Sequence, residues 1–67
     1  MANPNLTATK DFHAFIDRLA DGTTAIVEIY RIKGFQLGRR VQRFETASRG
    51  AKTRARQACR DLQRARR

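Results

Sequence analysis

The segment TAIVEIYRI, residues 24–32, constrains the fold more than any other part of the chain. It is rich in β-branched and aromatic residues, a composition typical of a β-strand. Val27 and Ile29 share one face of this strand, whereas Ile26 and Tyr30 share the other. Both faces are partly apolar, so the pattern marks neither of them as the solvent-exposed face.

A second strand is predicted over residues 39–46, RRVQRFET, after a turn of sequence KGFQLG at residues 33–38. A two-stranded sheet is barely stable alone, and its edges are open to pairing. We therefore expect a homodimer in which two hairpins join into one four-stranded sheet.

The segment before this hairpin is predicted to be a helix over residues 9–20. Phe12, Phe15, Ile16 and Leu19 recur at the spacing of one apolar helix face. The Asp-Gly pair that follows is a typical helix end. Residues 1–6 are interpreted as a flexible tail.

A long helix is predicted over residues 48–65, with Thr46 or Ser48 as its N-terminal cap. Its apolar stripe is made mostly of small residues: Ala47, Ala51, Ala55, Ala58, Cys59, Leu62 and Ala65. This helix can therefore approach its partner surface closely. The predicted fold is a single α+β domain in the order α-β-β-α, with the helices packed on an antiparallel hairpin.

The reactive residues are too few for several kinds of site. The 67 residues include one cysteine, Cys59, and one histidine, His13, which supply neither a disulfide framework nor four metal ligands. The sequence shows no paired carboxylates for acid-base catalysis and no glycine-rich phosphate loop. We therefore expect a non-catalytic protein without metal or cofactor.

The sequence also bears on the cellular compartment. The N-terminal sequence MANPNLTATK lacks the apolar core of a signal peptide, and no run of about 20 apolar residues is present to span a bilayer. A single thiol suits a reducing environment. We therefore expect a cytoplasmic protein.

Charge is divided unevenly along the chain. Residues 1–30 carry two Lys or Arg and four Asp or Glu, whereas residues 31–67 carry thirteen Lys or Arg and two Asp or Glu. Twelve of the fifteen bases are Arg, whose planar donor fork suits phosphates and base edges. A basic half of a small domain indicates an acidic partner, most often nucleic acid.

The predicted nucleic-acid-binding residues lie on the C-terminal helix and the second strand. On the helix, cations recur at every fourth residue and form a ridge opposite the alanine stripe, without the Glu partners of an ordinary solvated helix. The predicted contacts are Arg39, Arg40, Arg43, Arg49, Lys52, Arg56, Arg60, Arg64 and Arg67. The alternative is a solvated face, since like charges four residues apart cost only about 0.2–0.5 kcal/mol per pair.

Aromatic and thiol side chains complete the set of candidate residues. Tyr30 and Phe35 are candidates for stacking on bases, with Phe35 in the turn expected to be the more exposed. Phe44 is expected in the core. Cys59 is interpreted as a buried, inert thiol, and His13 as a partly exposed helix residue.

Residues 38–62 resemble the final strand and helix of the AP2-like, arm-binding domains of tyrosine recombinases. These domains often end in a basic strand, an F-x-T step and an alanine-containing helix, to which Arg43, Phe44, Thr46 and Ala51 correspond. In that family the sheet face enters the DNA major groove. The resemblance implies DNA contacts by Arg39, Arg40, Gln42 and Arg43. The sequence departs from the pattern in having two clear strands and a helix before them.

A second resemblance is to double-stranded RNA-binding domains, which have a similar length and a basic start to their last helix. The sequence SRGAK, residues 48–52, is similar to that start but one residue shorter. Both resemblances imply nucleic acid and draw on the same basic residues. We expect DNA rather than RNA, on the strength of the recombinase-like match.

The main alternative is a protein-binding module. Tiny α+β chains are often encoded by phages or mobile elements, where they inhibit or modulate a host protein or nucleoprotein complex. The basic face would then bind an acidic partner. A membrane surface is the third choice and is not expected, because the basic helix lacks the bulky apolar face that interfacial helices insert.

Overall fold

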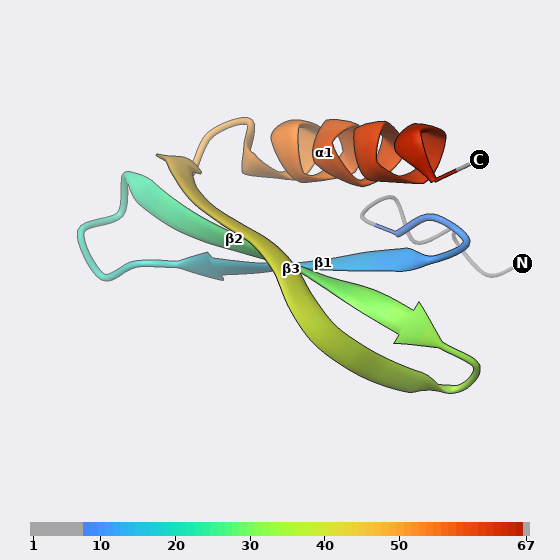
Figure 1. Cartoon of the computed structure of the whole chain (residues 1–67). Helices are drawn as coiled ribbons and strands as arrows, with labels where there is room; N and C mark the ends of the chain where they lie inside the picture. Colours follow the sequence, from blue (N-terminus) through green and yellow to red (C-terminus); the bar gives the residue numbers. More distant parts are fainter. Residues whose placement is uncertain (1–7, 67) are drawn as a thin grey trace, which may run out of the picture.

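The computed structural model describes residues 8–66 of the chain. Three strands, β1 (Phe12–Arg18), β2 (Thr24–Lys33) and β3 (Gln36–Ala47), precede one helix, α1 (Ala51–Ala65) (Figure 1). The strands form an antiparallel sheet in the order β1-β2-β3, and α1 lies across one face of it. The α+β class is confirmed, but the order is β-β-β-α. The predicted tail at residues 1–6 lies outside the described part of the chain.

The predicted N-terminal helix over residues 9–20 is wrong, because this segment contains strand β1. Phe12, Ala14 and Ile16 alternate along the strand and face α1; Phe12 and Ala14 are buried, and Ile16 packs against them. Phe15 lies on the opposite face. Because Phe15 follows Phe12 by three residues, its apolar side chain produced the helical spacing that led to the wrong prediction. Pairing with β2 selects the two-residue period, since it satisfies the backbone groups along one edge of β2.

The turn between β1 and β2 is formed by the Asp-Gly pair that was predicted to end a helix. Asp21 Oδ1 accepts hydrogen bonds from the backbone N–H groups of Thr23 and Thr24, both at 2.9 Å. The Thr24 hydroxyl donates to Asp21 Oδ2 at 2.7 Å. These bonds, that of the hydroxyl foremost, lower the pKa of Asp21 to about 2. Gly22 supplies the positive φ of 78° that the turn requires.

The core lies between α1 and the strands β1 and β2. Ala25, Val27 and Ile29 of β2 are completely buried, as are Ala51, Ala55 and Cys59 of α1. The small-residue stripe is therefore confirmed at its centre, and Ala58 and Leu62 pack beside it. Its predicted ends, Ala47 and Ala65, are exposed. Burial raises the pKa of the Cys59 thiol, as expected for an inert cysteine.

Helix α1 begins three residues later than predicted, and neither predicted cap is used. Gly50 occupies the N-cap position with a φ of 84°, and no side chain caps the helix. Thr46 belongs to β3, which continues to Ala47. The backbone N–H of Ser48 donates to the carbonyl of Thr23 at 2.7 Å. The chain must therefore reverse within two residues, which favours a glycine with positive φ.

The β2–β3 hairpin is longer, and its turn tighter, than the sequence indicated. Lys33 pairs with Gln36, so the turn consists of Gly34 and Phe35 alone. Of these two residues only Gly34 has a positive φ, 61°, which is the pattern of a type II′ turn. Strand β3 accordingly begins at Gln36 instead of Arg39.

The third strand changes the argument for a homodimer. That expectation rested on a two-stranded sheet, whereas β2 has a neighbour on both sides. The stability of the fold therefore does not require a second copy of the hairpin. Because β3 lies at an edge of the sheet, where its outer backbone groups can pair, dimerisation stays a prediction.

Candidate nucleic-acid interface

Helix α1 covers one face of the sheet and leaves the other uncovered (Figure 1). Cross-strand pairing arranges the side chains of this second face in three rows. The rows are His13–Tyr30–Arg40, Phe15–Glu28–Arg43 and Asp17–Ile26–Glu45. We call these nine residues the uncovered face.

Three rings form an aromatic patch on the uncovered face. Phe15 is 43% exposed and lies 4.7 Å from the ring of His13 and 5.6 Å from that of Tyr30, measured between centroids. Tyr30 meets Phe15 edge to face. His13 belongs to strand β1 and not to the predicted helix. The patch offers the π-faces on which bases stack.

A β-bulge in β3 places two arginines on the same face as this patch. Ile29 pairs with Gln42, whereas Tyr30 pairs with Arg40, which leaves Val41 as an extra residue. Residues three apart on a regular strand point to opposite faces. Because of the bulge, Arg40 and Arg43 lie on one face instead.

The two arginines differ in their partners. Arg40 Nη1 lies 2.7 Å from Glu28 Oε2, in an ion pair whose side chains are 49% and 32% exposed. Arg43 is exposed and stands directly opposite Glu28 in the strand register. Within residues 8–66, no ion pair involves Arg43. The uncovered face thus presents one cation already held in position and a second available to a ligand.

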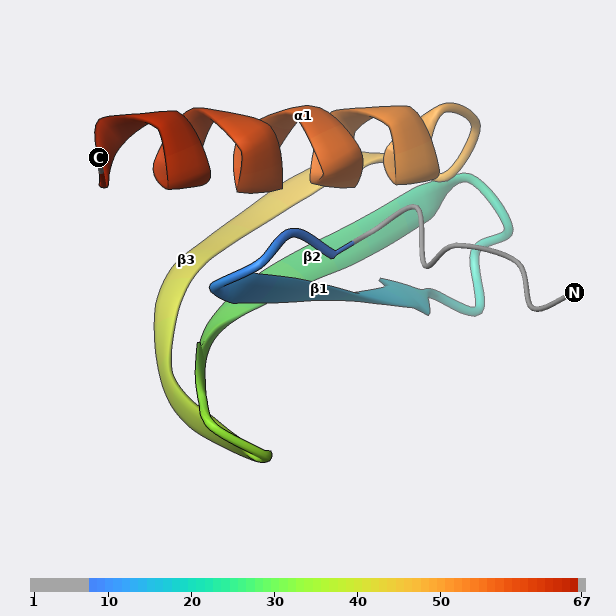
Figure 2. The ribbon, with the colours of Figure 1, turned by 90° about the vertical axis from the view of Figure 1, so that its right-hand side faces the viewer.

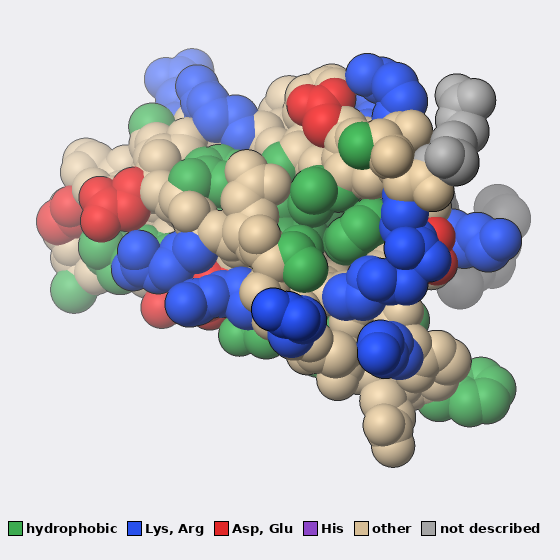
Figure 3. Space-filling model, in the orientation of Figure 1, with side chains coloured by type: hydrophobic (Ala, Val, Ile, Leu, Met, Phe, Trp, Pro, Cys, Tyr) green, Lys and Arg blue, Asp and Glu red, His purple; other side chains and the backbone are tan. Residues whose placement is uncertain are grey.

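The remaining predicted residues of β3 point elsewhere. Gln42 pairs with Ile29 on the covered side. Arg39 is exposed and, by alternation with Arg40, projects from the opposite face of the hairpin. The Lys and Arg side chains nevertheless gather in a band along the course of β3 (Figure 3).

The cations of α1 form a separate surface. Lys52, Arg60 and Arg64 are exposed and Arg56 is half-buried, whereas the buried stripe of the same helix faces the sheet. This ridge and the uncovered face therefore lie on opposite sides of the domain. The structure does not unite the predicted helix and strand residues in one surface.

The remaining predicted contacts lie near the ends of α1. Arg49 is exposed in the connection before the helix, and its backbone carbonyl accepts a hydrogen bond from Arg54 Nη1 at 3.1 Å. Arg67 lies outside the described residues.

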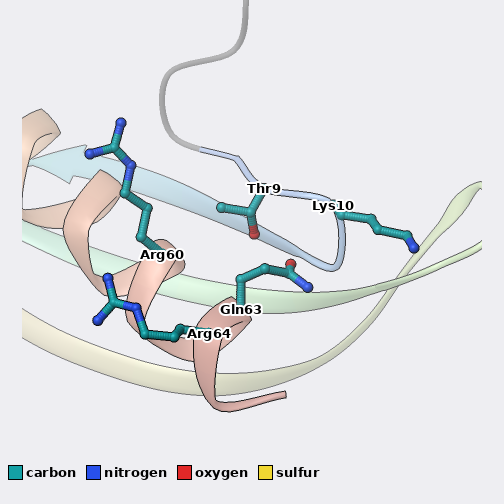
Figure 4. Close-up of a pocket in the computed structure, with 5 residues that line it drawn as sticks. All are labelled: Thr9, Lys10, Arg60, Gln63 and Arg64. Atoms are coloured by element: carbon teal, nitrogen blue, oxygen red, sulfur yellow. The ribbon is translucent and has the colours of Figure 1, made fainter. Parts of the chain in front are cut away.

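An open cleft lies between α1 and the residues before β1, lined by Thr9, Lys10, Arg60, Gln63 and Arg64. Lys10 extends in the opposite direction from Arg60 and Arg64 (Figure 4). These cations therefore do not converge on a common anion position.

The side chain of Gln63, beside this cleft, is occupied by Asp11. Gln63 Oε1 accepts from the Asp11 backbone N–H at 2.8 Å, and Gln63 Nε2 donates to Asp11 Oδ2 at 2.7 Å. Arg66 Nε adds a bond to the same carboxylate oxygen at 3.2 Å. These contacts, that of Gln63 foremost, lower the pKa of Asp11. This network fixes the end of α1 against the start of β1 and has a structural role.

The predicted stacking residues are both accessible, and sequence reasoning missed a third. Tyr30 lies in the aromatic patch, and Phe35 is completely exposed at the hairpin tip. Phe44 is half-buried against the core, as expected. Phe15 was missed because it was assigned to the apolar face of a helix. The alternation of FHAFIDR was the signal that could have identified it.

Two further observations limit the kinds of site. Across residues 8–66, no group of three His, Cys, Asp or Glu side chains is arranged to hold a metal ion. The described helix is too short and too polar to cross a membrane.

Comparisons with protein-family models, with curated proteins and with solved structures find no match.

Proposed function

We propose that this chain is a non-catalytic DNA-binding protein whose uncovered face contacts duplex DNA. The observation that carries the proposal is the bulge at Val41, which aligns Arg40 and Arg43 beside the aromatic patch. The formal net charge of +9 supplies long-range attraction to a polyanion. The proposed compartment is the reducing cytoplasm, in keeping with a single buried thiol.

The geometry of DNA suits such a surface. The major groove is about 12 Å wide and admits a two-stranded β-ribbon. Arg side chains on the ribbon can donate two hydrogen bonds to a guanine edge or bind a phosphate. In this arrangement Arg40 and Arg43 contact the DNA directly, and Tyr30 provides apolar area behind them.

The resemblance to recombinase arm-binding domains supports the same orientation. The two departures from that family's pattern were the missing strand and the extra helix. Both departures were errors of the sequence-based prediction, since β1 is a strand and α1 is the one helix of residues 8–66. In that family the sheet face enters the major groove, which corresponds here to Arg40 and Arg43. The implied contacts by Arg39 and Gln42 fit this orientation less well, because they point away from the uncovered face.

The ridge on α1 receives a different role in this proposal. It lies on the far side of the domain and does not reach the DNA segment that contacts the uncovered face. Lys52, Arg56, Arg60 and Arg64 then act through solubility and electrostatic steering. Double-stranded RNA is the less suitable ligand, because its deep, narrow major groove does not admit a sheet.

A protein partner is the second proposal, favoured by the exposed apolar side chains on the hairpin and the uncovered face. Phe15, Leu37 and Val41 are between 41% and 50% exposed. Such a module would bind and modulate a host protein or a nucleoprotein complex. It would show little affinity for generic DNA at physiological salt.

The test compares two double variants with equal loss of charge. Arg40→Gln with Arg43→Gln changes the uncovered face, and Arg60→Gln with Arg64→Gln changes the helix ridge. Binding to a labelled 20-base-pair duplex is measured by fluorescence anisotropy over roughly 50–300 mM salt. We expect the first variant to lose at least about tenfold in affinity and about two units of salt slope. We expect the second to lose about twofold to threefold, through the net charge alone.

Equal losses in the two variants would contradict the assignment to the uncovered face. No binding of the wild-type protein near physiological salt would contradict DNA binding as a whole. Duplex RNA of the same sequence serves as the control ligand and is expected to bind more weakly.

A further inference from the structure

The outer half of the β2–β3 hairpin projects beyond the part of the sheet that α1 covers. We call residues 30–41 the hairpin arm. Figure 2 shows the arm curving away from α1, so that it extends on the side of the uncovered face. The arm carries Arg31, Lys33, Arg39 and Arg40 and no acidic residue.

The tip of the arm presents one fully exposed aromatic ring. Phe35 is 107% exposed relative to the reference for its residue type. The type II′ turn contains only two residues, and Lys33 and Gln36 pair immediately beneath it. The ring therefore extends from a short, defined turn and not from a long loop.

An exposed phenyl ring at this position has no role in the fold. Phenyl groups gain strongly from removal from water, and Phe35 is the most exposed of the large apolar residues in the described part of the chain. The core cluster of β1, β2 and α1 does not include it. The ring is therefore available to a partner.

We propose that Phe35 is a wedge that contacts unstacked bases, so that the protein prefers duplex DNA with a locally disrupted step to fully paired duplex. The proposal rests on the proposed function and adds the kind of DNA that is recognised. An apolar side chain that inserts at a base step partly unstacks it, as minor-groove-binding proteins show. In the proposed function, Phe35 would reach the step from the major groove that holds the hairpin. The unstacking cost is smallest where a base is already mismatched or unpaired.

The charge of the arm favours DNA over a protein pocket as the occupant. Four cations and no acidic residue lie within the twelve residues of the arm. Arg40 is paired with Glu28 just outside the arm, whereas Arg31, Lys33 and Arg39 form no ion pair within residues 8–66. A phosphate backbone lies on both sides of every base step and complements these cations. A hydrophobic pocket of a protein would bury Phe35 but would need its own acidic rim.

The first experiment measures preference between two duplexes. One 20-base-pair duplex is fully paired, and the other has the same sequence with a central two-nucleotide bulge. We expect the wild-type protein to bind the bulged duplex about tenfold more tightly, because stacking on one base corresponds to a change of that order. Phe35→Ala should lose this preference while its affinity for the paired duplex stays within about twofold of wild type.

Leu37→Ala is the matched control, since Leu37 is another exposed apolar residue of the arm. We expect this variant to keep at least half of the preference. Phe35→Ala removes no buried contact, so its circular-dichroism melting curve should match that of the wild type.

The second experiment uses fluorescence. The chain contains no tryptophan, so Phe35→Trp introduces a single reporter. We expect the bulged duplex to quench its emission more strongly than the paired duplex at equal saturation, as stacking on bases requires.

The possible results separate the two levels of the proposal. If Phe35→Ala keeps the preference, or if the Trp emission is unchanged on binding, the wedge is wrong although DNA binding by the uncovered face stands. If the wild type binds both duplexes with equal affinity, the wedge is wrong and Phe35 is available to a protein partner instead. If the wild type binds neither duplex, both the wedge and the proposed function are wrong.

Discussion

The two faces of the same sheet carry opposite kinds of side chain. The covered face places Ala25, Val27 and Ile29 against α1, and no polar or charged residue is buried in the described part of the chain. The uncovered face combines aromatic rings with charged side chains, as in the row Phe15–Glu28–Arg43. All three strands contribute to both faces, so the difference lies in which alternate residues of each strand point toward α1.

In this small domain, the residues buried for stability lie on a different face of the sheet from the exposed charged residues. Helix α1 packs closely because its inner side is nearly all alanine, which concentrates burial in a few residues. Most charged side chains of the uncovered face are exposed, so this face should contribute less to the free energy of folding. Stability and ligand binding should therefore respond to different substitutions, even at neighbouring positions of β2.

The largest effect is expected from truncating the covered side of β2. Ile29→Ala should lower the free energy of unfolding by about 2–5 kcal/mol, since it leaves a cavity under α1. Ile26→Ala, the same chemical change on the uncovered face, should cost less than half as much because Ile26 is only half-buried. Urea denaturation followed by circular dichroism measures both. Equal losses would mean that the uncovered face is covered in solution, as it would be in a dimer.

Overfilling the covered side tests the same division from the other direction. Ala55→Leu should lower the free energy of unfolding by about 1–3 kcal/mol, because Ala55 is completely buried against the sheet. Ala65→Leu places the same side chain on an exposed position of α1 and should stay within about 0.5 kcal/mol of wild type. Thermal melts of the two variants provide the measurement. A tolerant Ala55 would show that the helix can move away from the sheet.

These patterns also explain which parts of the fold could be predicted from the sequence. Strand β2 was found from its β-branched and aromatic composition, and the small-residue stripe was found from its helical spacing. Phe44 was expected in the core, and it packs against the core cluster. In each case one local pattern agreed with the packing that the structure shows.

The first segment was mispredicted because two periods coexist in it. Phe12, Phe15 and Ile16 suit a helix, whereas Phe12, Ala14 and Ile16 suit a strand. Only the pairing with β2, which is not local, decides between them.

The candidate site was harder to predict than the fold. Arg40 and Arg43 share a face only because Val41 forms a bulge, and no pattern of apolar residues marks that position. Without the bulge, strand alternation would have separated the two arginines. The sequence therefore supplied candidate DNA-binding residues but did not show which of them lie together.

A smaller effect is expected where the uncovered face restrains its own arginine. Glu28→Gln removes the ion pair that holds Arg40 and deletes a negative charge from the proposed interface. Affinity for duplex DNA should rise by up to about fivefold, and stability should change by less than about 1 kcal/mol, the range of exposed ion pairs. Glu45→Gln is the matched control, because Glu45 lies on the same face opposite Ile26. A rise of equal size in the control would indicate net charge and not release of Arg40.

The smallest effect concerns acid stability and lies away from both faces, at the β1–β2 turn. The folded-state pKa of Asp21 is about 2, below its ordinary value of 3.8, because Thr24 and the backbone of Thr23 hydrogen-bond its carboxylate. The ionised group therefore stabilises the folded state above about pH 4, and this contribution disappears as the pH falls toward 2. Asp21→Asn should reduce the dependence of stability on pH in that window and leave DNA affinity within about twofold.

Thr24→Val, which keeps the charge but removes the leading hydrogen bond, should raise the pKa of Asp21 part of the way to 3.8. Carboxyl-carbon chemical shifts measured by NMR between pH 5 and pH 1.5 follow this titration directly. A midpoint near 3.8 in the wild type would mean that the turn does not hold Asp21 in solution, and the start of β2 would then have to be fixed by strand pairing alone.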